Sequence, residues 1–415
     1  MQNKRIVVVG AGPAGMMAAI RSGELTRGVT LIEKNSSAGK KLLLSGKGRC
    51  NLTNACDLDS FLAHFSKNGE FLRDAFRKLF NRELIGFFEK AGLKLKTERQ
   101  LRVFPASDRS DSILRVLKEA LRRSRVVTRY GSALKELLIR EKRIIGLLLA
   151  SGETVAADRV ILATGGVSYS FTGSTGEGIN IVARLGHKIT ALKAGLVPLE
   201  TRQRVPRLLQ GLALRNIRLK FGCGRNEIIT DIGELLFTGF GISGPLVLTV
   251  SGRIADWLKV KGSSVYLEID LKPGLSREQL EMRILREFRA EPRKNIKNIL
   301  NNLLPKRLSA VLLDLAGITA QKKAAAVTQE ERRRLLDLLK RFRLNILGTR
   351  PIEEAMVTRG GISLKDINPR SMESRLVKGL YFAGEMIDLD ADTGGFNLQA
   401  AFSTGYLAGE SAALN

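Results

Sequence analysis

The chain begins with a short apolar run that leads directly into glycines. Ile6-Val7-Val8-Val9 has the length and the β-branched composition of a buried strand, and Gly10-Ala11-Gly12-Pro13-Ala14-Gly15 follows it. A helical pattern then extends to about Gly28, before a second strand-like run, Val29-Thr30-Leu31-Ile32-Glu33. The order strand, turn, helix, strand predicts a βαβ unit at the start of the chain.

The glycines of this turn have separate physical tasks. Gly10 permits the tight turn, Gly12 lets the backbone approach a pyrophosphate, and Gly15 lets the helix pack closely on the strand. The start of the helix offers free N–H groups and a positive dipole end to phosphates. Glu33, roughly 20 residues further on, can accept a hydrogen bond from a ribose 2′-OH. The unit predicts a dinucleotide site, with a glycine-rich turn that binds nothing as the alternative.

The stretch from Gly39 to Asn54 is polar and interrupted by glycines, which predicts an extended loop rather than a helix. It offers backbone N–H groups, two Asn amides and an Arg fork, which are groups that hold phosphate and the edge of a heteroaromatic ring. The alternative is a solvated surface loop.

Further elements follow in the next hundred residues. Apolar residues between Leu58 and Leu93 recur mainly at helical spacings and predict two amphipathic helices. We expect a short strand and turn from Arg99 to Pro105 and another helix from Asp111 to Arg123. A meander of short strands is predicted for Val126-Val127-Thr128, Ala133–Leu138, Ile144–Ala150 and Val155-Ala156.

An apolar strand running into two glycines then follows, Val160-Ile161-Leu162-Ala163-Thr164-Gly165-Gly166. This order of elements is shared by FAD proteins built like glutathione reductase. Near the end of the chain, a buried strand from Leu380 is predicted to deliver Gly384 and the acidic residues Glu385 and Asp388 to the cofactor. A helix should begin at about Asn397, and its first N–H groups can face the flavin pyrimidine edge, where negative charge develops on reduction.

Taken together, the chain resembles the BaiN/YhiN-like flavoproteins, also called the aminoacetone oxidase-type FAD-binding family. The resemblance covers nearly the whole length and rests on four separated motifs in the same order. These motifs are Ser45–Asn54, Thr238–Pro245, Thr358–Gly361 and Gly394–Ala401.

The resemblance implies an α/β fold, with a discontinuous, glutathione-reductase-like Rossmann FAD domain and a large insert. The expected domains are residues 1–190 plus 362–415 for FAD, 191–275 plus 345–361 for a β-barrel-like insert, and 276–344 for a basic helical subdomain. Strand-like runs in the barrel part are Leu214–Phe221, Glu227–Leu236 and Val265–Asp270, whereas the last part alternates apolar and charged residues at helical spacing.

We expect the cofactor to be held by residues from the glycine turn, the Ser45–Asn54 motif, the ends of the strands and the start of the last helix. They are Gly10, Gly12, Pro13, Ala14, Gly15, Glu33, Lys34, Gly39, Lys41, Ser45, Gly46, Gly48, Arg49, Asn51, Leu52, Thr53, Ala133, Thr164, Gly165, Gly166, Gly384, Glu385, Asp388, Gly395, Phe396 and Asn397.

One dinucleotide fingerprint is accounted for by FAD, and no second strand, glycine turn and helix unit is present for NAD(P)H. The segment from Gly173 to Gly178 has glycines but no apolar strand before it, so it is interpreted as a turn near the flavin. A nicotinamide donor would therefore be a transient co-substrate.

Net charge is the unusual property of the sequence. Sixty-eight Lys and Arg against 41 Asp and Glu give a formal charge of +27 and a pI near 10.4. Such a field attracts polyanions, above all nucleic acid, although a lineage bias toward basic proteins is the alternative. Candidate RNA contacts are Arg286, Arg289, Arg293 and Lys297, placed on one face of a helix, with Arg333 and Arg334; a solvated helix face is the alternative.

Composition limits the remaining possibilities. A chain of 415 residues suggests two or three domains, and no apolar run is long enough to predict a membrane span. Three cysteines without paired spacing favour a reducing compartment, so we expect a cytoplasmic protein. Two histidines and no CxxC motif make a metal site improbable, so none is predicted.

For proton transfer the candidate is Cys50, because it is the one cysteine inside a cofactor motif. Reduction of an activated C=C bond needs hydride at one carbon and a proton at the next, which a nearby thiol could donate. The alternative is that Cys50 packs against the flavin or the sheet. Arg49 could orient an anionic substrate or pair with FAD phosphate.

The resemblance implies three activities: reduction of bile-acid enones, oxidation of aminoacetone, and reduction of uridine to dihydrouridine in ribosomal RNA. The charge favours a polyanionic substrate, and an enzyme would draw the uracil base out of its stack to reach it. The leading hypothesis is an FAD-dependent, NAD(P)H-consuming reductase of rRNA uridine. The alternatives are a small-molecule flavin oxidoreductase and an RNA-binding flavoprotein with structural or sensing FAD.

Overall fold

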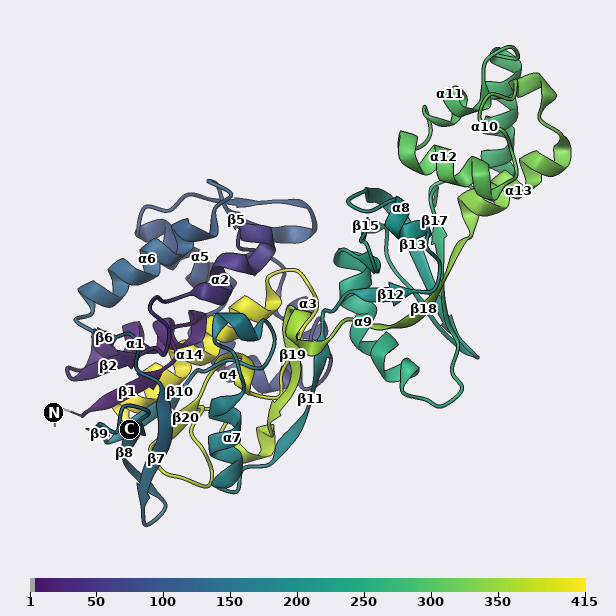
Figure 1. Ribbon diagram of the computed structural model, residues 1–415. Coiled ribbons are helices and arrows are strands. Elements are labelled where there is room, and N and C mark those ends of the chain that lie inside the picture. The colour runs from purple at the N-terminus through teal and green to yellow at the C-terminus, as the bar shows by residue number, and fades with distance from the viewer. Residues whose placement is uncertain (1–3) are drawn as a thin grey trace. The chain divides into compact units, whose positions relative to one another are not determined.

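The computed structural model describes residues 4–415, which form two compact units (Figure 1). Unit 1 contains the chain up to Gly195 together with Ile352–Asn415, and unit 2 is Leu196–Pro351. Each unit has its own cluster of buried apolar side chains. Within the described part of the chain, none of the helices combines the length and the apolar character needed to cross a membrane.

Unit 1 is built on a five-stranded parallel sheet in the order β20-β10-β1-β2-β6. The strands are β1 (Ile6–Val9), β2 (Val29–Ile32), β6 (Val127–Arg129), β10 (Arg159–Leu162) and β20 (Leu380–Phe382). Strands β1 and β20 are buried along their whole length, as expected for a sheet covered on both faces. The predicted Rossmann architecture is confirmed, and its last strand comes from the C-terminal part of the chain.

Strand β6 corrects one prediction. The run at Val126 was assigned to the antiparallel meander, but it pairs in parallel with β2, with Thr30 opposite Val127. The meander contains only β7 (Leu134–Arg140), β8 (Arg143–Leu149) and β9 (Thr154–Ala156). A strand of three residues is too short for its sequence pattern to show which sheet it joins. Its place in the parallel sheet is decided by its pairing with the free edge of β2.

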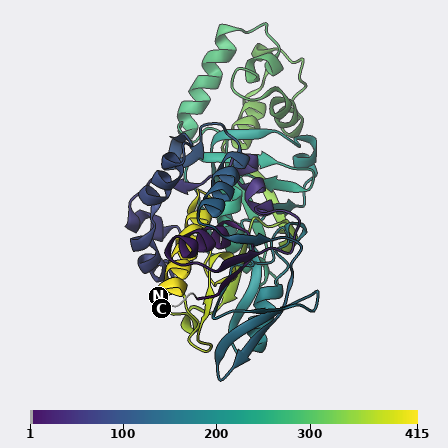
Figure 2. The ribbon, with the colours of Figure 1, turned by 90° about the vertical axis from the view of Figure 1, so that its left-hand side faces the viewer.

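Two long helices cover the sheet of unit 1 and contact each other closely. Helix α1 (Pro13–Leu25) packs against α14 (Phe396–Leu414), drawn in yellow in Figure 1, and the two also lie together in Figure 2. A Cβ atom added to Gly405 would lie 2.2 Å from the carbonyl oxygen of Ala14, and one added to Gly409 would lie 2.3 Å from that of Ala18. The helices can therefore approach this closely only where α14 has no side chain.

The other elements of unit 1 surround this core. The helices are α2 (Lys40–Leu44), α3 (Leu58–Ala63), α4 (Arg73–Lys78), α5 (Asn81–Lys90), α6 (Ser110–Arg123) and α7 (Glu177–Arg184). The small sheets pair β3 (Thr53–Asn54) and β4 (Leu95–Thr97) with β5 (Arg102–Pro105), and β11 (Ile189–Gly195) with β19 (Val357–Ile362). Single 3₁₀ turns occupy Ser45–Gly48, Gly69–Leu72, Arg99–Leu101, Ser170–Thr172, Ile352–Glu354, Leu364–Asp366 and Gly384–Met386.

Two local predictions in this region were wrong. The stretch from Gly39 was expected to be extended, but it begins with α2, because buried Leu42 anchors one helical turn beneath the polar residues. The segment from Leu58 to Leu93 was expected to form two helices and forms three, with a 3₁₀ turn between α3 and α4. The predicted helix over Asp111–Arg123 is confirmed as α6.

Unit 2 contains a closed barrel of six strands, which confirms the predicted β-barrel-like insert. Neighbouring strands pair in the ring β13-β15-β16-β12-β18-β17, and β17 pairs back with β13. Their bounds are β12 (Leu199–Thr201), β13 (Ala213–Cys223), β15 (Gly233–Phe237), β16 (Gly241–Ser243), β17 (Val265–Asp270) and β18 (Phe342–Thr349), with β14 (Asn226–Ile229) paired outside the ring. The run predicted from Glu227 to Leu236 is thus divided between β14 and β15.

Helices follow the barrel strands in sequence and share their apolar cluster. They are α8 (Val205–Leu208), α9 (Pro245–Leu258), α10 (Arg277–Ala290), α11 (Ile296–Leu300), α12 (Lys306–Leu315) and α13 (Gln329–Lys340), with a 3₁₀ turn at Ala324–Ala326. Ser276 and Thr328 cap α10 and α13 in reciprocal capping boxes with Gln279 and Glu331. The division of the chain into three domains stays a prediction.

The close contact between α1 and α14 can be tested with two Gly→Ala substitutions in helices. Gly405→Ala should lower the free energy of unfolding of the FAD-free protein by about 1–3 kcal/mol, because its Cβ overlaps the backbone of α1. Gly86→Ala in α5 has no atom within 4 Å of the added Cβ and should stabilise by roughly 0.5–1 kcal/mol. Urea unfolding measures both, and equal effects would contradict the close packing.

Candidate flavin site

The glycine turn between β1 and α1 combines two tightly packed positions with one open position. A Cβ atom on Gly10, which has a φ of +99°, would lie 2.5 Å from the carbonyl oxygen of Ala163. A Cβ on Gly15 would lie 1.8 Å from the carbonyl oxygen of Gly10. In contrast, a Cβ on Gly12 would have no described atom within 4 Å. The turn is therefore packed against the sheet on one side and leaves space at the start of α1, as a bound pyrophosphate requires.

Glu33 is held beside this turn at the end of β2. Its carboxylate accepts hydrogen bonds from the backbone N–H of Ala11, at 2.8 Å, and from the backbone and side chain of Asn35 at 2.8 and 2.7 Å. The backbone N–H of Ser132, next to Ala133, donates to the carbonyl oxygen of Glu33. Glu33 and Ala133, which are 100 positions apart in the sequence, are thus brought to the same edge of the sheet.

Lys34 and Gly39 complete the surroundings of the turn. The Lys34 ammonium donates to the Thr175 hydroxyl at 2.8 Å and to Glu177 at 3.0 Å, which connects β2 to the segment from Gly173 to Gly178. That segment forms the turn expected from sequence and leads into α7. The N–H of Gly39 donates to the carbonyl oxygen of Ala11 at 2.9 Å.

A partly buried network of polar groups lies at the end of the parallel sheet. The Lys41 ammonium contacts the Glu385 carboxylate at 2.5 Å and the Ser168 hydroxyl at 2.7 Å. The other oxygen of Glu385 accepts from Ser168 and from the N–H of Thr358, both at 2.8 Å. The hydroxyl of Thr358 in turn accepts from the N–H groups of Val167 and Ser168. This network joins α2, the loop after β10, β19 and the turn after β20.

Glu385 remains charged although its side chain is only 19% exposed. Burial acts to raise the pKa of Glu385, but the charge and hydrogen bond of Lys41, with the hydrogen bonds from Thr358 and Ser168, bring that pKa below its ordinary value. A carboxylate held in this way has a fixed position and orientation. Sequence analysis predicted Lys41 and Glu385 as cofactor residues, whereas Thr358 was noted only as part of a motif and Ser168 became apparent only from the contacts.

Arg49 and Cys50 are placed differently from each other. The Arg49 guanidinium pairs with Glu98 at 2.5 Å and with Asp108 at 2.6 Å, and it stacks on the Phe104 ring at 4.2 Å. These partners favour a structural role for Arg49. The Cys50 thiol is fully buried, and this burial raises its pKa to about 12. The structure therefore favours the packing alternative for Cys50 over the role of proton donor.

Several polar atoms near these motifs are buried without a partner. Asn51 Oδ1, Thr164 Oγ1 and Asp388 Oδ1 have no hydrogen-bond partner among the described residues. Leaving such atoms unpaired costs free energy, so each calls for a partner from outside the protein chain. FAD carries hydroxyl and N–H groups that can serve as partners, and the open position at Gly12 suits its pyrophosphate. The residues present therefore fit this cofactor.

The start of α14 lies against the Ser45–Asn54 motif. A Cβ on Gly395, whose φ is +99°, would lie 2.5 Å from the backbone of Thr53, and the Asn54 side-chain amide donates to the carbonyl oxygen of Gly394 at 3.3 Å. The helix begins at Phe396, one residue before the predicted start. Asn397 uses its side chain to bind the backbone of the preceding loop, at Ala391 and Asp392.

The other predicted cofactor residues fall at the same edge of unit 1. Pro13 and Ala14 open α1, and the 3₁₀ turn Ser45–Gly48 contains Gly46 and Gly48, both with positive φ. Buried Leu52 precedes β3, Gly165 and Gly166 follow β10, and Gly384 follows β20. Gly384 contacts α1, because an added Cβ would lie 2.8 Å from that of Ala14.

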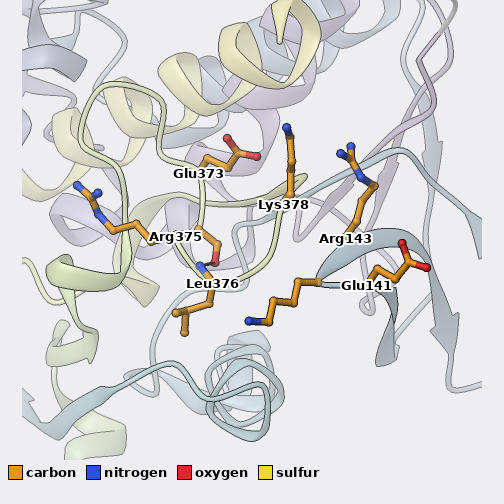
Figure 3. Close-up of a pocket in the computed structure, with 8 residues that line it drawn as sticks. Glu141, Arg143, Glu373, Arg375, Leu376 and Lys378 are labelled. Atoms are coloured by element: carbon orange, nitrogen blue, oxygen red, sulfur yellow. Dashed lines mark hydrogen bonds between the residues drawn. The ribbon is translucent and has the colours of Figure 1, made fainter.

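A polar surface pocket elsewhere in unit 1 contains none of these residues (Figure 3). It lies between the β7–β8 turn and the segment from Glu373 to Lys378, which pair through a bridge between Arg143 and Lys378. Its charged side chains are of both signs, and none of the residues that line it has a buried polar atom without a hydrogen-bond partner. The glycine-turn edge is therefore the candidate site.

The predicted basic stripe is not on one helix. Helix α10 ends at Ala290, because Pro292 follows and cannot continue it, so Arg293 lies in a connection and Lys297 is on α11. Arg286 and Arg289 remain together on α10 and are exposed. Arg334 is paired with Glu330 at 3.0 Å, whereas Arg333 is exposed and has no ion pair within residues 4–415.

Comparison with known proteins identifies the family. The family described as "HI0933-like protein Rossmann domain" matches residues 4–411. The chain belongs to this family. Its members are FAD-dependent oxidoreductases. FAD, which could supply hydrogen-bond partners for the buried polar atoms of Asn51, Thr164 and Asp388, is therefore also the cofactor of the family.

Three curated relatives match over almost the whole length. A 3-dehydro-bile acid delta(4,6)-reductase from Clostridium scindens is 32% identical over 99% of both chains. A ribosomal RNA dihydrouridine synthase from Haemophilus influenzae is 30% identical over 96% of both chains. The ribosomal RNA dihydrouridine synthase from Escherichia coli is also 30% identical, and the match covers 98% of this chain and 97% of that one.

Solved structures share the fold at low identity. A 3-ketosteroid-delta4-(5alpha)-dehydrogenase from Rhodococcus jostii has a TM-score of 0.54 at 16% identity, and the match covers 99% of this chain and 97% of that one. An E. coli quinol fumarate reductase chain also has a TM-score of 0.54 at 16% identity, covering 99% and 70%. These likenesses support the fold.

The open position at Gly12 gives a prediction about FAD affinity. Gly12→Ala should leave the stability of the FAD-free protein nearly unchanged but raise the FAD dissociation constant about tenfold or more, because the methyl group enters the space left for the cofactor. Fluorescence titration with FAD measures this change. Gly274→Ala, whose added Cβ also meets no atom within 4 Å, is the control, and an unchanged FAD affinity for Gly12→Ala would contradict the assignment.

The Lys41–Glu385 pair gives a prediction about pH. Lys41→Met should destabilise the FAD-free protein by about 2 kcal/mol at neutral pH, because it leaves a partly buried carboxylate without its charged partner. Since the pKa of Glu385 is lowered in the folded protein, the contribution of the pair is present above its ordinary value of 4.5 and is lost as pH falls below it. Urea unfolding at several pH values should show the two proteins converging in acid, and a constant difference would argue against this pair.

Proposed function

We propose that the protein is an NAD(P)H-consuming reductase of an activated C=C bond, and that its favoured substrate is uridine in ribosomal RNA, which it converts to dihydrouridine. The first half of this proposal is supported by the relatives. The names bile acid delta(4,6)-reductase and dihydrouridine synthase both describe saturation of a carbon–carbon double bond. Each such bond is conjugated to a carbonyl group, which makes one carbon receptive to hydride.

FAD would be held at the glycine-turn edge of unit 1. Gly12 and the first N–H groups of α1 would face the pyrophosphate, and Glu33 would receive the ribose hydroxyls. Asn51, Thr164 and Asp388 would complete their hydrogen bonding with the cofactor. Bound FAD, once reduced, would supply the hydride, with its two electrons, that the substrate carbon needs. The protein then has to place the substrate, exclude water and deliver one proton.

The choice of RNA as substrate rests on unpaired positive charge. Between residues 276 and 344 there are 17 Lys and Arg against eight Asp and Glu. Four of the predicted contacts, Arg286, Arg289, Arg293 and Lys297, are exposed and have no ion pair in the described part of the chain. Groups of one sign without internal partners favour a phosphate backbone over a steroid or a small amine.

NAD(P)H is proposed as the electron donor because one dinucleotide unit is present, and FAD would occupy it. In the described residues the parallel sheet of unit 1 has one glycine turn leading into a helix after a strand, at β1. The donor would visit the flavin and leave after reducing it.

A small-molecule C=C reductase is the second candidate. It is favoured by the bile acid delta(4,6)-reductase, which is 32% identical over 99% of both chains. In this case the unpaired charge of residues 276–344 would have no part in catalysis. An RNA-binding protein whose FAD is structural or sensing is the remaining alternative.

The proposal is tested by reducing the purified holoprotein with NADPH in the absence of oxygen. Ribosomal RNA from a strain that lacks the protein is then added. We expect flavin reoxidation together with new dihydrouridine, measured by mass spectrometry of the RNA nucleosides. If RNA does not reoxidise the flavin but a steroid enone does, the small-molecule alternative is supported. Fast turnover with aminoacetone as the electron donor and O₂ as the acceptor would also support it. RNA binding without flavin reoxidation would support the RNA-binding protein whose FAD is structural or sensing.

A charge-removal series tests the basic surface. The triple variant Arg286→Gln, Arg289→Gln, Lys297→Gln should bind ribosomal RNA more weakly, and the slope of log affinity against log salt should fall by about two to three, because up to three phosphate contacts are lost. The matched control removes equal charge from α6 with Arg115→Gln, Arg122→Gln and Arg123→Gln, which are exposed and paired with acids of the same helix. Equal effects of the two triples would exclude a specific surface.

A further inference from the structure

His64 lies against the first residue of α14. Its imidazole ring stacks on the Phe396 ring, with centroids 4.1 Å apart and an interplanar angle of 21°. The Phe61 ring contacts Phe396 edge-on at 4.7 Å and fixes the platform beneath the imidazole. The His64 side chain is 45% exposed, in contrast to His187, the second histidine of the chain, which is buried.

Asp392 orients this imidazole. The Asp392 carboxylate lies 3.0 Å from Nδ1 of His64, and the N–H of Asp392 donates to the carbonyl oxygen of His64 at 3.0 Å. A bridge between Phe65 and Ala391 and a hydrogen bond from the N–H of Ser66 to the carbonyl oxygen of Asp390, at 2.9 Å, hold the same two segments together. The ring nitrogen Nε2 has no hydrogen-bond partner among residues 4–415. His64 therefore has one nitrogen fixed by a carboxylate and one nitrogen available.

The charged groups around the pair are partly neutralised. Asp388 contacts Lys67 at 3.3 Å, and Asp390 accepts from the Ser66 hydroxyl at 2.8 Å and lies 3.7 Å from Arg359. Burial raises the pKa of Asp390, so this carboxyl is the nearest competing proton source. The unpaired oxygen of buried Asp388 shows that a group from outside the chain is expected beside this cluster.

We propose that His64, oriented by Asp392, is the catalytic acid that donates a proton from Nε2 to the substrate carbon next to the one that receives hydride. This role rests on the proposed function. The hydride brings two electrons and forms one C–H bond, and the π electrons of the C=C bond form the second C–H bond with the proton from His64. The imidazole is left neutral, with Nδ1–H still donating to Asp392, and it regains a proton from water.

The position of His64 suits this role better than that of the other candidates. The acid must reach a substrate above the flavin, so it needs an exposed donor atom near the cofactor edge. Cys50 is fully buried, and Asp390 is 8% exposed and engaged by Ser66. His64 is exposed and sits at the start of α14, where the helix N-terminus favours negative charge on the cofactor or the substrate. Histidine also exchanges protons readily near neutral pH.

His64→Gln tests the proposal in the reduced holoprotein. Reoxidation by ribosomal RNA should slow by about 10²- to 10⁴-fold, whereas reoxidation by ferricyanide should stay unchanged, because that acceptor takes electrons without forming a C–H bond. Asp392→Asn should give a smaller loss of about 10- to 100-fold, by analogy with other groups that orient a histidine. The control Asp59→Asn, an acid 84% exposed on α3, should have no effect.

A second measurement does not depend on turnover. Diethyl pyrocarbonate should modify His64 and not buried His187 in the FAD-free protein, and FAD should slow this reaction several-fold if His64 lies at the cofactor edge. Unchanged modification with FAD would overturn the proposal. So would RNA-driven reoxidation at the wild-type rate in His64→Gln. If the wild type itself does not reduce RNA, the proposed function fails, and protection by FAD still decides whether His64 borders the flavin.

Discussion

The contact between the backbones of α1 and α14 is the constraint on which the site depends. Because Gly405 and Gly409 have no side chains, α14 approaches to within atomic contact of the carbonyl oxygens of α1. The first helix of the chain carries the glycine turn, and the last carries Phe396 and Asn397 at its start. Their close packing brings two motifs from opposite ends of the sequence to one edge of the sheet.

Polar groups then fix this edge in place. The Lys41–Glu385 pair and its hydroxyl partners connect four separate segments, so each segment has a defined position before any cofactor binds. Such a network costs desolvation and is stable only when each member has a partner. Among the buried polar atoms without a partner, those of Asn51, Thr164 and Asp388 lie near the cofactor motifs, where a bound group could supply the missing hydrogen bonds.

The two units divide the features that chemistry and recognition would need. The glycine turn and the His64–Asp392 pair belong to unit 1. So do the buried polar atoms of Asn51, Thr164 and Asp388 that have no hydrogen-bond partner. The exposed basic residues without ion pairs that are predicted to contact RNA belong to unit 2, on and between the helices α10, α11 and α13. An insert of this kind can change substrate class while the flavin domain is kept, which is consistent with relatives named for a bile acid and for ribosomal RNA.

The sequence by itself determined the features that local pattern controls: the β1-α1-β2 unit with its glycines, the start of α14 to within one residue, and the barrel strands β13 and β17. It did not reveal that the run at Val126 joins the parallel sheet or that Cys50 is fully buried. It also did not reveal the contact between His64 and Asp392, which are 328 positions apart. Sheet membership, burial and pairing between distant residues depend on which surfaces meet after folding, so only the tertiary structure decided them.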